Sequence, residues 1–358
     1  MSNATVCSVI VLTLPLLNTA CDDVDWPESR YVDSLRVLAV RAEPPTLTPG
    51  ASTRLSVLCV DGSRGTTAAP ECEGEIAWFA GCNNPEKNDP DRCLAQYSTM
   101  DVPQGTYVAA TPSDAYPSGF GYGRTLDFAA PTGVLTEQFD TFGQSIRYGT
   151  SYVFFALCAG RLTWASNHAQ QLPLACHDVD SGVVVDQRRF VVGVTTIYSY
   201  DRVMSQNPEL LAPEWDGIDL PASCDSVADC PNGFECGTDN HCVPVVPRCN
   251  RADAENCEEH CLSYAVARDA FSLLGLDGSS IDAPQKSLWI NYLTNAGRLP
   301  DDEAGFGLPA PDNASDLQRT PCIRWQTPTT VTDQAYLWAV VRDSRGGASV
   351  ATQRIIVR

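Results

Sequence analysis

LRVLAVRAEPPTLTPGASTRLSVLCV, residues 35–60, is the stretch that decides the fold. Residues 35–41 and 53–60 alternate apolar and polar side chains, and a Pro-rich segment ending at Pro49-Gly50 separates them. Alternation with a period of two is typical of a strand with one buried face, and Pro and Gly mark the turn between strands. Strand, turn and strand in this order predict the opening of an immunoglobulin-like (Ig-like) β-sandwich.

Three further strands are expected in the same sandwich. Glu75–Ala80 predicts a strand with Trp78 at its centre, and Tyr152–Cys158 and Arg189–Thr195 predict a closing pair. We therefore expect the first sandwich to span residues 34–197. Between its strands, residues 81–147 predict a long irregular insertion, in which the Gly/aromatic stretch 118–123 is expected to be a mobile loop.

The order Cys59, Trp78, Cys158 resembles the immunoglobulin Cys…Trp…Cys pattern, in which the Trp packs on a bridge between the two sheets. Four other cysteines in this half of the chain compete for the same partners, and Ala156 stands where a Tyr is usual. The pattern leaves open whether such a bridge forms.

A second sandwich is expected over residues 198–358. Asp343–Gly347 predicts a hairpin turn between its last two strands. A stretch poor in apolar residues, 224–285, carries seven cysteines and predicts a disulfide-rich insert, because burial alone cannot fold it. Within it, Ala252–Leu274 has a helical composition and predicts a short helix. The expected strands are Lys286–Leu293, Cys322–Trp325, Ala335–Arg342 and Val350–Val357.

The predicted fold class is therefore mainly β, with two Ig-like β-sandwich domains, the second interrupted by a small disulfide-rich module and a short helix. A content of 25 Gly and 25 Pro in 358 residues agrees with many turns and short elements. The formal net charge of −20 would repel phosphate backbones, so nucleic acid is not an expected partner.

The N-terminus predicts export. Val6–Leu17 is apolar but shorter than the roughly 20 residues that span a bilayer, and small residues follow it, as in a signal peptide. We expect a signal peptide at 1–20, a lipid on Cys21 and an acidic tether at 21–33. The alternative is ordinary cleavage near Ala20, with Cys21 in a disulfide.

Cysteine usage places the chain in an oxidising compartment. Of 16 cysteines, Cys7 lies in the signal peptide and Cys21 is the lipidation candidate, which leaves an even number for disulfides. The cluster from Cys224 to Cys261 holds seven, so one must pair outside it, and Cys322 is the expected partner. The disulfide candidates are Cys59, Cys72, Cys82, Cys93, Cys158, Cys176, Cys224, Cys230, Cys236, Cys242, Cys249, Cys257, Cys261 and Cys322.

No catalytic motif is found in the sequence: it has no G-x-S-x-G, HExxH or phosphate-binding loop. Three weaker patterns, one for zinc and two for calcium, could indicate a metal site. A zinc cluster could use cysteines and histidines, but disulfides are expected to prevail in an oxidising space. Two Asp-x-Asp pairs could bind Ca²⁺, although neither completes a calcium loop. The residues concerned are Cys242, Cys257, Cys261, His241 and His260 for zinc, and Asp89, Asp91, Asp178 and Asp180 for calcium.

Three segments carry a resemblance to a family. LRVLAVRAEPP (35–45), DCPNGFEC (229–236) and YLWAVVRDSRGG (336–347) resemble uncharacterised envelope lipoproteins of the myxobacterial type. The resemblance covers most of the mature chain and implies a lipid-anchored, Ig-like exported protein. It carries over no catalytic residue.

The expected function is that of a non-enzymatic, lipid-anchored protein of the bacterial outer membrane or periplasm, including the cell surface, with a role in adhesion or protein recognition. A membrane is the expected partner through the lipid, and a protein or glycan is the expected ligand; no cofactor and no metal are expected. One alternative is an exported hydrolase or carbohydrate-active protein that uses the 81–147 insertion, with Trp164, His168 or His177 beside Asp residues in a pocket. The other is a purely structural envelope component.

Overall fold

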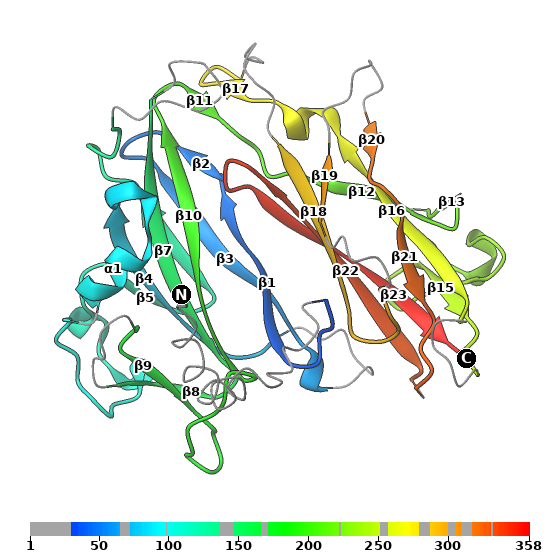
Figure 1. Ribbon diagram of the computed structural model, residues 1–358, viewed down its shortest axis with the longest axis horizontal. Helices are drawn as coiled ribbons and strands as arrows, with labels where there is room; N and C mark the ends of the chain where they lie inside the picture. The colour runs from blue at the N-terminus through cyan, green and yellow to red at the C-terminus, as the bar shows by residue number, and fades with distance from the viewer. Residues whose placement is uncertain are drawn as a thin grey trace, which may run out of the picture.

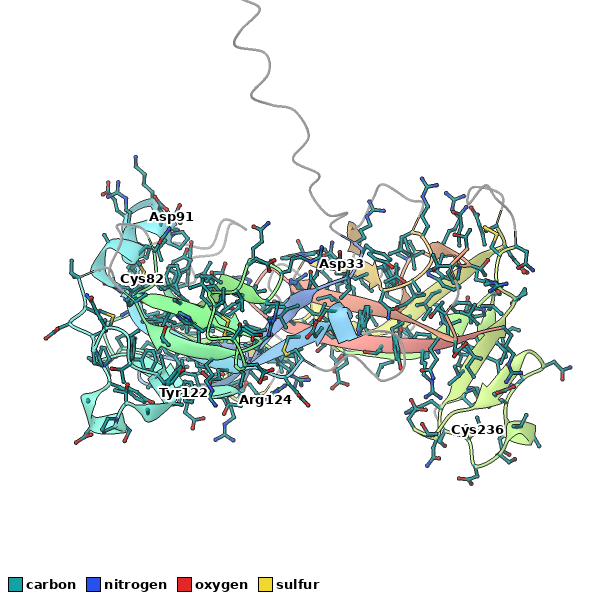
Figure 2. The ribbon with its side chains drawn as sticks, turned by 90° about the horizontal axis from the view of Figure 1, so that it is seen from below. Asp33, Cys82, Asp91, Tyr122, Arg124 and Cys236 are labelled. Atoms are coloured by element: carbon teal, nitrogen blue, oxygen red, sulfur yellow. A yellow bond between two sulfur atoms is a disulfide. The ribbon has the colours of Figure 1, made fainter. Side chains whose placement is uncertain are left out.

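The computed structural model describes residues 30–358 except 65–71, 98, 137–146, 166–170, 222, 251–256, 279–286, 300–304, 309–316 and 331. Two β-sandwiches lie side by side, and the long strands of both meet near the middle of the molecule (Figure 1). The predicted mainly β, sandwich-like fold class is confirmed. Seen from a perpendicular direction, Asp91 and Cys236 lie at opposite ends, and Asp33 lies near the junction (Figure 2).

The first sandwich consists of a three-stranded sheet, β1-β3-β6, packed on a five-stranded sheet, β2-β10-β7-β4-β5. Its core gathers Leu55, Trp78 and Phe155 from both sheets. The predicted strands are present, and the expected closing pair is β7 and β10, which run antiparallel over their whole length. The strands are β1 (Leu35–Glu43), β2 (Thr46–Leu47), β3 (Ser52–Asp61), β4 (Glu75–Asn83), β5 (Phe120–Tyr122), β6 (Thr125–Ala129), β7 (Tyr148–Cys158) and β10 (Phe190–Tyr200).

Strand β7 is buried on both faces, so it lacks the alternation of a sheet that faces water. Phe155 points into the sandwich core, and Phe154 points into a second cluster on the outer face. That outer face is covered by α1 (Asp91–Tyr97) and by a small sheet of β8 (Arg161–Trp164) and β9 (Leu174–His177).

The predicted insertion 81–147 is an insertion only in part. Its stretch 118–123, expected as a mobile loop, contains β5, which pairs with β4 at the edge of a sheet. The Trp78 indole N–H donates to the Gly123 carbonyl over 2.8 Å. Gly119 has φ +79°, and a Cβ there would lie 2.4 Å from the Ala80 carbonyl oxygen, so the glycine permits the close approach of the two strands. The mobile-loop prediction is wrong because these glycines serve strand packing.

The second sandwich consists of two sheets. One has the strand order β13-β12-β16-β20, with β21 also paired to β16, and the other is six-stranded, with the order β14-β15-β23-β22-β18-β19. Its core centres on Trp325 and Leu337. The strands are β12 (Leu210–Trp215), β13 (Ile218–Asp219), β14 (Phe234–Cys236), β15 (Cys242–Val246), β16 (Glu259–Ala267), β18 (Leu288–Thr294), β19 (Gly305–Leu308), β20 (Leu317–Arg319), β21 (Ile323–Gln326), β22 (Gln334–Asp343) and β23 (Ala348–Val357).

Two short strands, β11 (Val203–Met204) and β17 (Leu274–Gly275), form a separate pair. Single 3₁₀ turns complete the described elements. They lie at Gly62–Arg64, Glu86–Asn88, Val108–Ala110, Ser113–Ala115, Val227–Asp229 and Arg268–Phe271.

The short helix expected within Ala252–Leu274 is wrong. Residues 259–267 form β16, in which every residue from Leu262 to Val266 is buried, and the 251–256 part lies outside the described residues. The predicted insert 224–285 therefore contains a central strand of the second sandwich. The same segment also contains β15, which joins the opposite, six-stranded sheet by pairing in parallel with β23.

The two sandwiches are joined by a fourth apolar cluster, which packs the outer face of β1 and β3 on the outer face of β22 and β23. An irregularity in the β1–β3 register between Val37 and Ala39 turns both Leu38 and Ala39 toward this cluster. The neighbouring Leu35 and Ala42 remain in the core of the first sandwich. Strand β1 is thus packed on both of its faces.

The predicted hairpin Asp343–Gly347 is present and is seated against the first sandwich. The Arg345 guanidinium lies over the Tyr200 ring, 5.1 Å from its centroid, and donates to its hydroxyl. Asn207 links the two sandwiches. Its Nδ2 donates to the Ala42 carbonyl of β1 over 2.8 Å, and its Oδ1 accepts from the Ala348 N–H of β23 over 3.0 Å.

Asn207→Ala should weaken the junction, because it leaves the Ala42 carbonyl and the Ala348 N–H without these partners at a buried position. We expect a loss of about 1–3 kcal/mol of unfolding free energy for each group that stays unsatisfied. Denaturant unfolding measures it, with the exposed Glu209→Ala in the same segment as control. Equal stability of the two variants would contradict the assigned role of Asn207.

Candidate recognition grooves

The fourteen candidate cysteines are joined in seven disulfides. In the first sandwich each pair is close in sequence, so the antibody-type bridge between Cys59 and Cys158 does not form. Trp78 instead packs against Phe155, with ring centroids 5.9 Å apart. The predicted link from the cluster to Cys322 is confirmed, with Cys261 as its partner. The pairs are Cys59–Cys72, Cys82–Cys93, Cys158–Cys176, Cys224–Cys236, Cys230–Cys242, Cys249–Cys257 and Cys261–Cys322.

The zinc cluster considered from the sequence is not assembled among the described residues. Its three cysteines each pair with a different partner, so no thiolate is left to bind a metal. The sulfurs of Cys224, Cys230 and Cys242 do lie within 4.8 Å of one another, but all three belong to the two disulfides that staple the module. Their proximity is that of two adjacent bridges.

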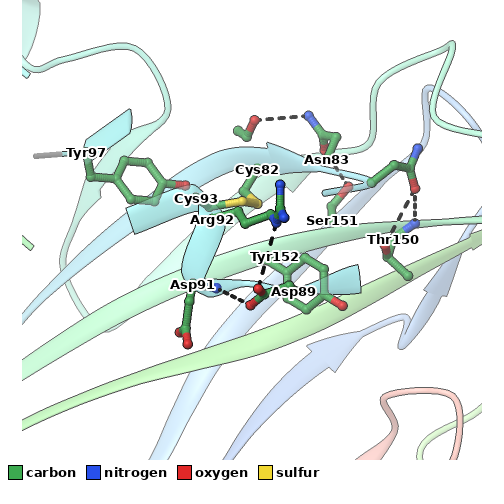
Figure 3. Close-up of a disulfide and its surroundings, with 12 residues drawn as sticks. Cys82, Asn83, Asp89, Asp91, Arg92, Cys93, Tyr97, Thr150, Ser151 and Tyr152 are labelled. Carbon is green, nitrogen blue, oxygen red and sulfur yellow. Dashed lines mark hydrogen bonds and ion pairs between the residues drawn. A yellow bond between two sulfur atoms is a disulfide. The ribbon is translucent and has the colours of Figure 1, made fainter. Parts of the chain in front are cut away.

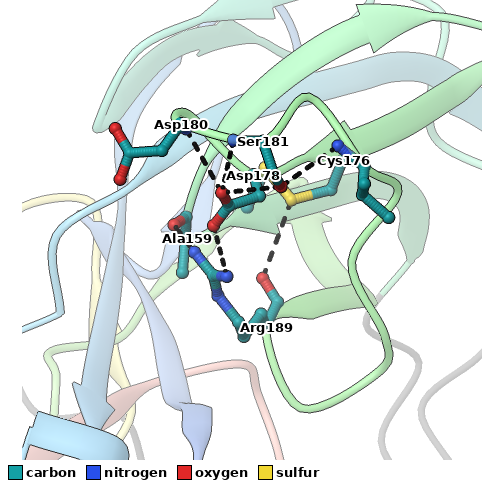
Figure 4. Close-up of polar contacts among 8 residues, drawn as sticks. Ala159, Cys176, Asp178, Asp180, Ser181 and Arg189 are labelled. Atoms are coloured by element: carbon teal, nitrogen blue, oxygen red, sulfur yellow. Dashed lines mark hydrogen bonds and ion pairs between the residues drawn. A yellow bond between two sulfur atoms is a disulfide. The ribbon is translucent and has the colours of Figure 1, made fainter.

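The Asp178 carboxylate, one of the calcium candidates, is already used by hydrogen-bond donors (Figure 4). Its Oδ1 accepts from the Ser181 N–H and hydroxyl and from the Asp180 N–H, and its Oδ2 accepts from Arg189 over 2.6 Å. These donors hold the pKa of Asp178 far below its ordinary value. An oxygen surrounded by N–H and O–H groups cannot also face a cation, so this turn closes the loop before β10.

The other calcium candidates, Asp89 and Asp91, lie at the start of α1 (Figure 3). The Asp89 Oδ1 accepts from the Asp91 N–H over 3.0 Å at the start of α1. Arg92 lies 2.5 Å from Glu86 and 3.9 Å from Asp89, so the acidic group is neutralised locally. Next to it the Cys82–Cys93 disulfide ties α1 to β4.

The pocket expected for a hydrolase is not assembled among the described residues. Trp164 is buried in the outer cluster, and its indole N–H donates to the Thr111 hydroxyl over 3.0 Å. The His177 Nδ1 lies 3.0 Å from the Gly182 carbonyl. His168, together with Cys7 and the lipidation candidate Cys21, lies outside the described residues.

One histidine–carboxylate pair was not predicted from the sequence. The His260 Nδ1 lies 2.7 Å from the Asp216 Oδ2, and the ring stacks on Trp215 at 5.2 Å. The other Asp216 oxygen accepts from the Cys261 N–H over 2.6 Å. Both oxygens thus fix the 216 turn to β16 beside the Cys261–Cys322 disulfide, which is a structural role.

A groove of about 470 Å³ lies where the two sandwiches meet. One wall is β1 at residues 37–40, the second is β10 at residues 191–196, and the third is formed by Trp289 and the segment 342–348. Trp289 is 37% exposed, which is unusual for a side chain of this size. We call this space the junction groove.

A second groove, of about 430 Å³, lies on the other face of β10. Phe154, Leu172 and Leu174 line it together with Val192 and Val194 of β10, and the lining is almost entirely apolar. Val192 and Val194 are 49% and 42% exposed. We call this space the outer groove. Strand β10 therefore separates two grooves, an arrangement that the apolar run of β10 in the sequence does not indicate.

No protein-family model matches the chain, and no curated protein does. Among solved structures it is similar to dimeric latent PorU from Porphyromonas gingivalis (9% identity, TM-score 0.19), the adhesin InvE of Yersinia pseudotuberculosis (9%, 0.17) and E. coli alpha-2-macroglobulin (11%, 0.20). The matches cover 91%, 90% and 92% of this chain but 24%, 60% and 16% of those chains. At these TM-scores the likenesses carry no argument about function. In the part of the chain that is described, no helix is long and apolar enough to span a membrane.

The disulfide pattern predicts a labelling result. Denatured but unreduced protein should take up no thiol reagent at the fourteen paired cysteines, and reduced protein should take it up at all of them. Mass spectrometry of the alkylated, digested protein reads out each site. Labelling of Cys242, Cys257 or Cys261 in native, unreduced protein, suppressed by added Zn²⁺, would instead support the zinc cluster.

Proposed function

We propose that this chain is a non-enzymatic, lipid-anchored protein of the bacterial cell envelope that recognises a protein partner. The observation that carries the recognition role is the pair of grooves on the two faces of β10. Grooves of this volume are where ligands bind proteins. The outer groove is lined mainly by apolar side chains, the junction groove adds the exposed Trp289 to a mixed polar and apolar lining, and both occur in a frame stapled by disulfides.

The proposed location rests on the cysteines and on the N-terminal sequence. Seven disulfides in one chain are typical of an oxidising compartment. The apolar stretch Val6–Leu17 with Asn18-Thr19-Ala20-Cys21 after it supports export and acylation. Kinship with myxobacterial-type envelope lipoproteins is part of the same proposal. Adhesion is the form of recognition that suits a protein held at the surface of a cell.

Acylation is tested by replacing Cys21. In the native envelope we expect a mature protein that begins at Cys21, carries an acyl adduct in its intact mass and partitions into detergent. Cys21→Ser should move it to the aqueous phase, because the lipid supplies the membrane affinity. Cys7→Ser is the matched control and should change nothing. A mature N-terminus upstream of residue 21, or an unmodified Cys21, would refute the anchor.

Recognition is tested with a photo-crosslinking amino acid in living cells. Placed at Trp289 in the junction groove, it should give a discrete adduct with a protein. Placed at Val227, which is 60% exposed on the disulfide module, it should not. Gel mobility and mass spectrometry identify the adduct. Equal, diffuse labelling at both positions, or none at either, would favour a purely structural component.

A further inference from the structure

Strand β10 has an open edge. It pairs with β7 along Phe190–Tyr200, but among the described residues its other side pairs with β2 only at Tyr198 and Ser199. Residues 190–195 therefore form a sheet edge six residues long. At Thr196 the edge is covered by the 343–347 hairpin, because a Cβ on Gly346 would lie 3.0 Å from the Thr196 carbonyl oxygen. Natural proteins usually cover or blunt such an edge, because its backbone groups can pair with another chain. Here the edge carries no charged side chain between Phe190 and Ile197.

The backbone groups that face outward can be assigned from two hydrogen bonds. The Ala159 N–H donates to the Arg189 carbonyl on the β7 side, and the Leu35 N–H donates to the Arg188 carbonyl on the opposite side. Because neighbouring residues of a strand point their backbone groups to opposite edges, those of Val192 and Val194 face away from β7. No hydrogen bond across this edge reaches either valine within the described chain.

The two grooves lie where side chains of an added strand would go. Successive side chains of a strand point to opposite faces of its sheet. One alternate set would enter the apolar outer groove beside Val192 and Val194, and the other would enter the junction groove beside Gly193 and Thr195. Gly193 has no side chain to fill its groove, and a Cβ there would lie 2.4 Å from the Phe155 ring.

Charge indicates which segment fits. The two charged groups in the junction groove are already engaged: Arg342 donates to the Leu38 carbonyl, and the Asp343 Oδ1 accepts from the Arg345 and Gly347 N–H groups. The groove lining is thus locally satisfied, whereas the whole chain has a formal charge of −20. At the start of the edge Arg188 and Arg189 are already paired with Asp33 and Asp178. The field of the whole chain therefore favours a segment of net positive charge, and the uncharged edge requires its basic residues to lie beyond the residues that pair.

We propose that an extended segment of a partner protein, with alternating apolar residues flanked by basic ones, adds as a strand to the edge of β10 at residues 190–195. Main-chain hydrogen bonds to Val192 and Val194 supply affinity, and the outer groove selects the apolar side chains. This inference rests on the proposed recognition function and specifies its partner and its mode.

The probe is a blocked synthetic peptide of about six alternating Val and Thr residues with two Lys at each end, a length that matches the open edge. Fluorescence-labelled peptide is titrated with the full mature protein. We expect saturable binding that weakens with added salt, since the attraction between Lys and the acidic protein is screened. Val194→Pro should weaken binding by about tenfold, because it removes an outward N–H. Val194→Ala, which keeps that N–H, is the matched control and should lose about threefold or less.

Two measurements separate strand addition from a folding defect or from simple groove binding. Thermal unfolding of Val194→Pro checks that the fold persists, as expected for proline on an edge strand. With unmodified protein, the Val192 and Val194 amides should gain protection from hydrogen exchange when peptide binds. N-methylation of the peptide at all Val residues or at all Thr residues should abolish binding for one set only, because a strand pairs through one edge.

Each contrary outcome has a definite meaning. Equal binding to Val194→Pro and Val194→Ala, without amide protection, would overturn strand addition but leave recognition by the grooves intact. A peptide methylated at every Val and Thr serves as the negative control. If the unmodified peptide binds no better than this control, strand addition is overturned, while crosslinking at Trp289 still tests recognition independently. Amides already protected in a free dimer that Val194→Pro dissociates would assign the edge to a second copy of this chain and overturn the partner proposal.

Discussion

The packing of β1 between two apolar clusters is the constraint on which the rest of the molecule depends. One face of the strand belongs to the core of the first sandwich, and Leu38 and Ala39 belong to the cluster between the sandwiches. Neither face can move without exposing apolar surface, at about 25 cal/mol for each Å² uncovered. The hairpin at 343–347 and Asn207 add polar contacts to the same junction. The junction groove therefore has walls from two sandwiches that are packed against each other.

Short-range patterns explain which parts of the fold were predictable. Strands β1 and β3 were predicted because apolar and polar residues alternate along them, β22 and β23 because they are rich in apolar and β-branched residues, and Asp343–Gly347 because its turn residues are characteristic. Strand β16 was missed because the four-residue spacing of Cys257 and Cys261 and the neighbouring alanines imitate a helix turn. Its position at the centre of a sheet overrode that local preference, since long-range pairing with β12 and β21 satisfies its backbone.

The candidate site was less predictable. Counting cysteines identified the bridge to Cys322, but the other pairings depend on which strands lie close together, which spacing does not reveal. The Asp pairs resembled metal ligands in sequence, and only their N–H partners show that Asp178 closes a turn. The grooves beside β10 follow from where β2 ends and from which side chains cover β7, and neither property is encoded in the residues of β10 itself.

The first described residues have a mechanical consequence. The Val32 N–H donates to the Thr294 carbonyl, and the Thr294 N–H donates to the Arg30 carbonyl, so the chain enters the fold along β18 of the second sandwich before it becomes β1 of the first. Asp33 lies near the middle of the long axis (Figure 2). A pulling force that arrives through residue 30 is thus applied at the seam, where it loads β18 of the second sandwich through Arg30 and Val32 before it reaches β1 of the first.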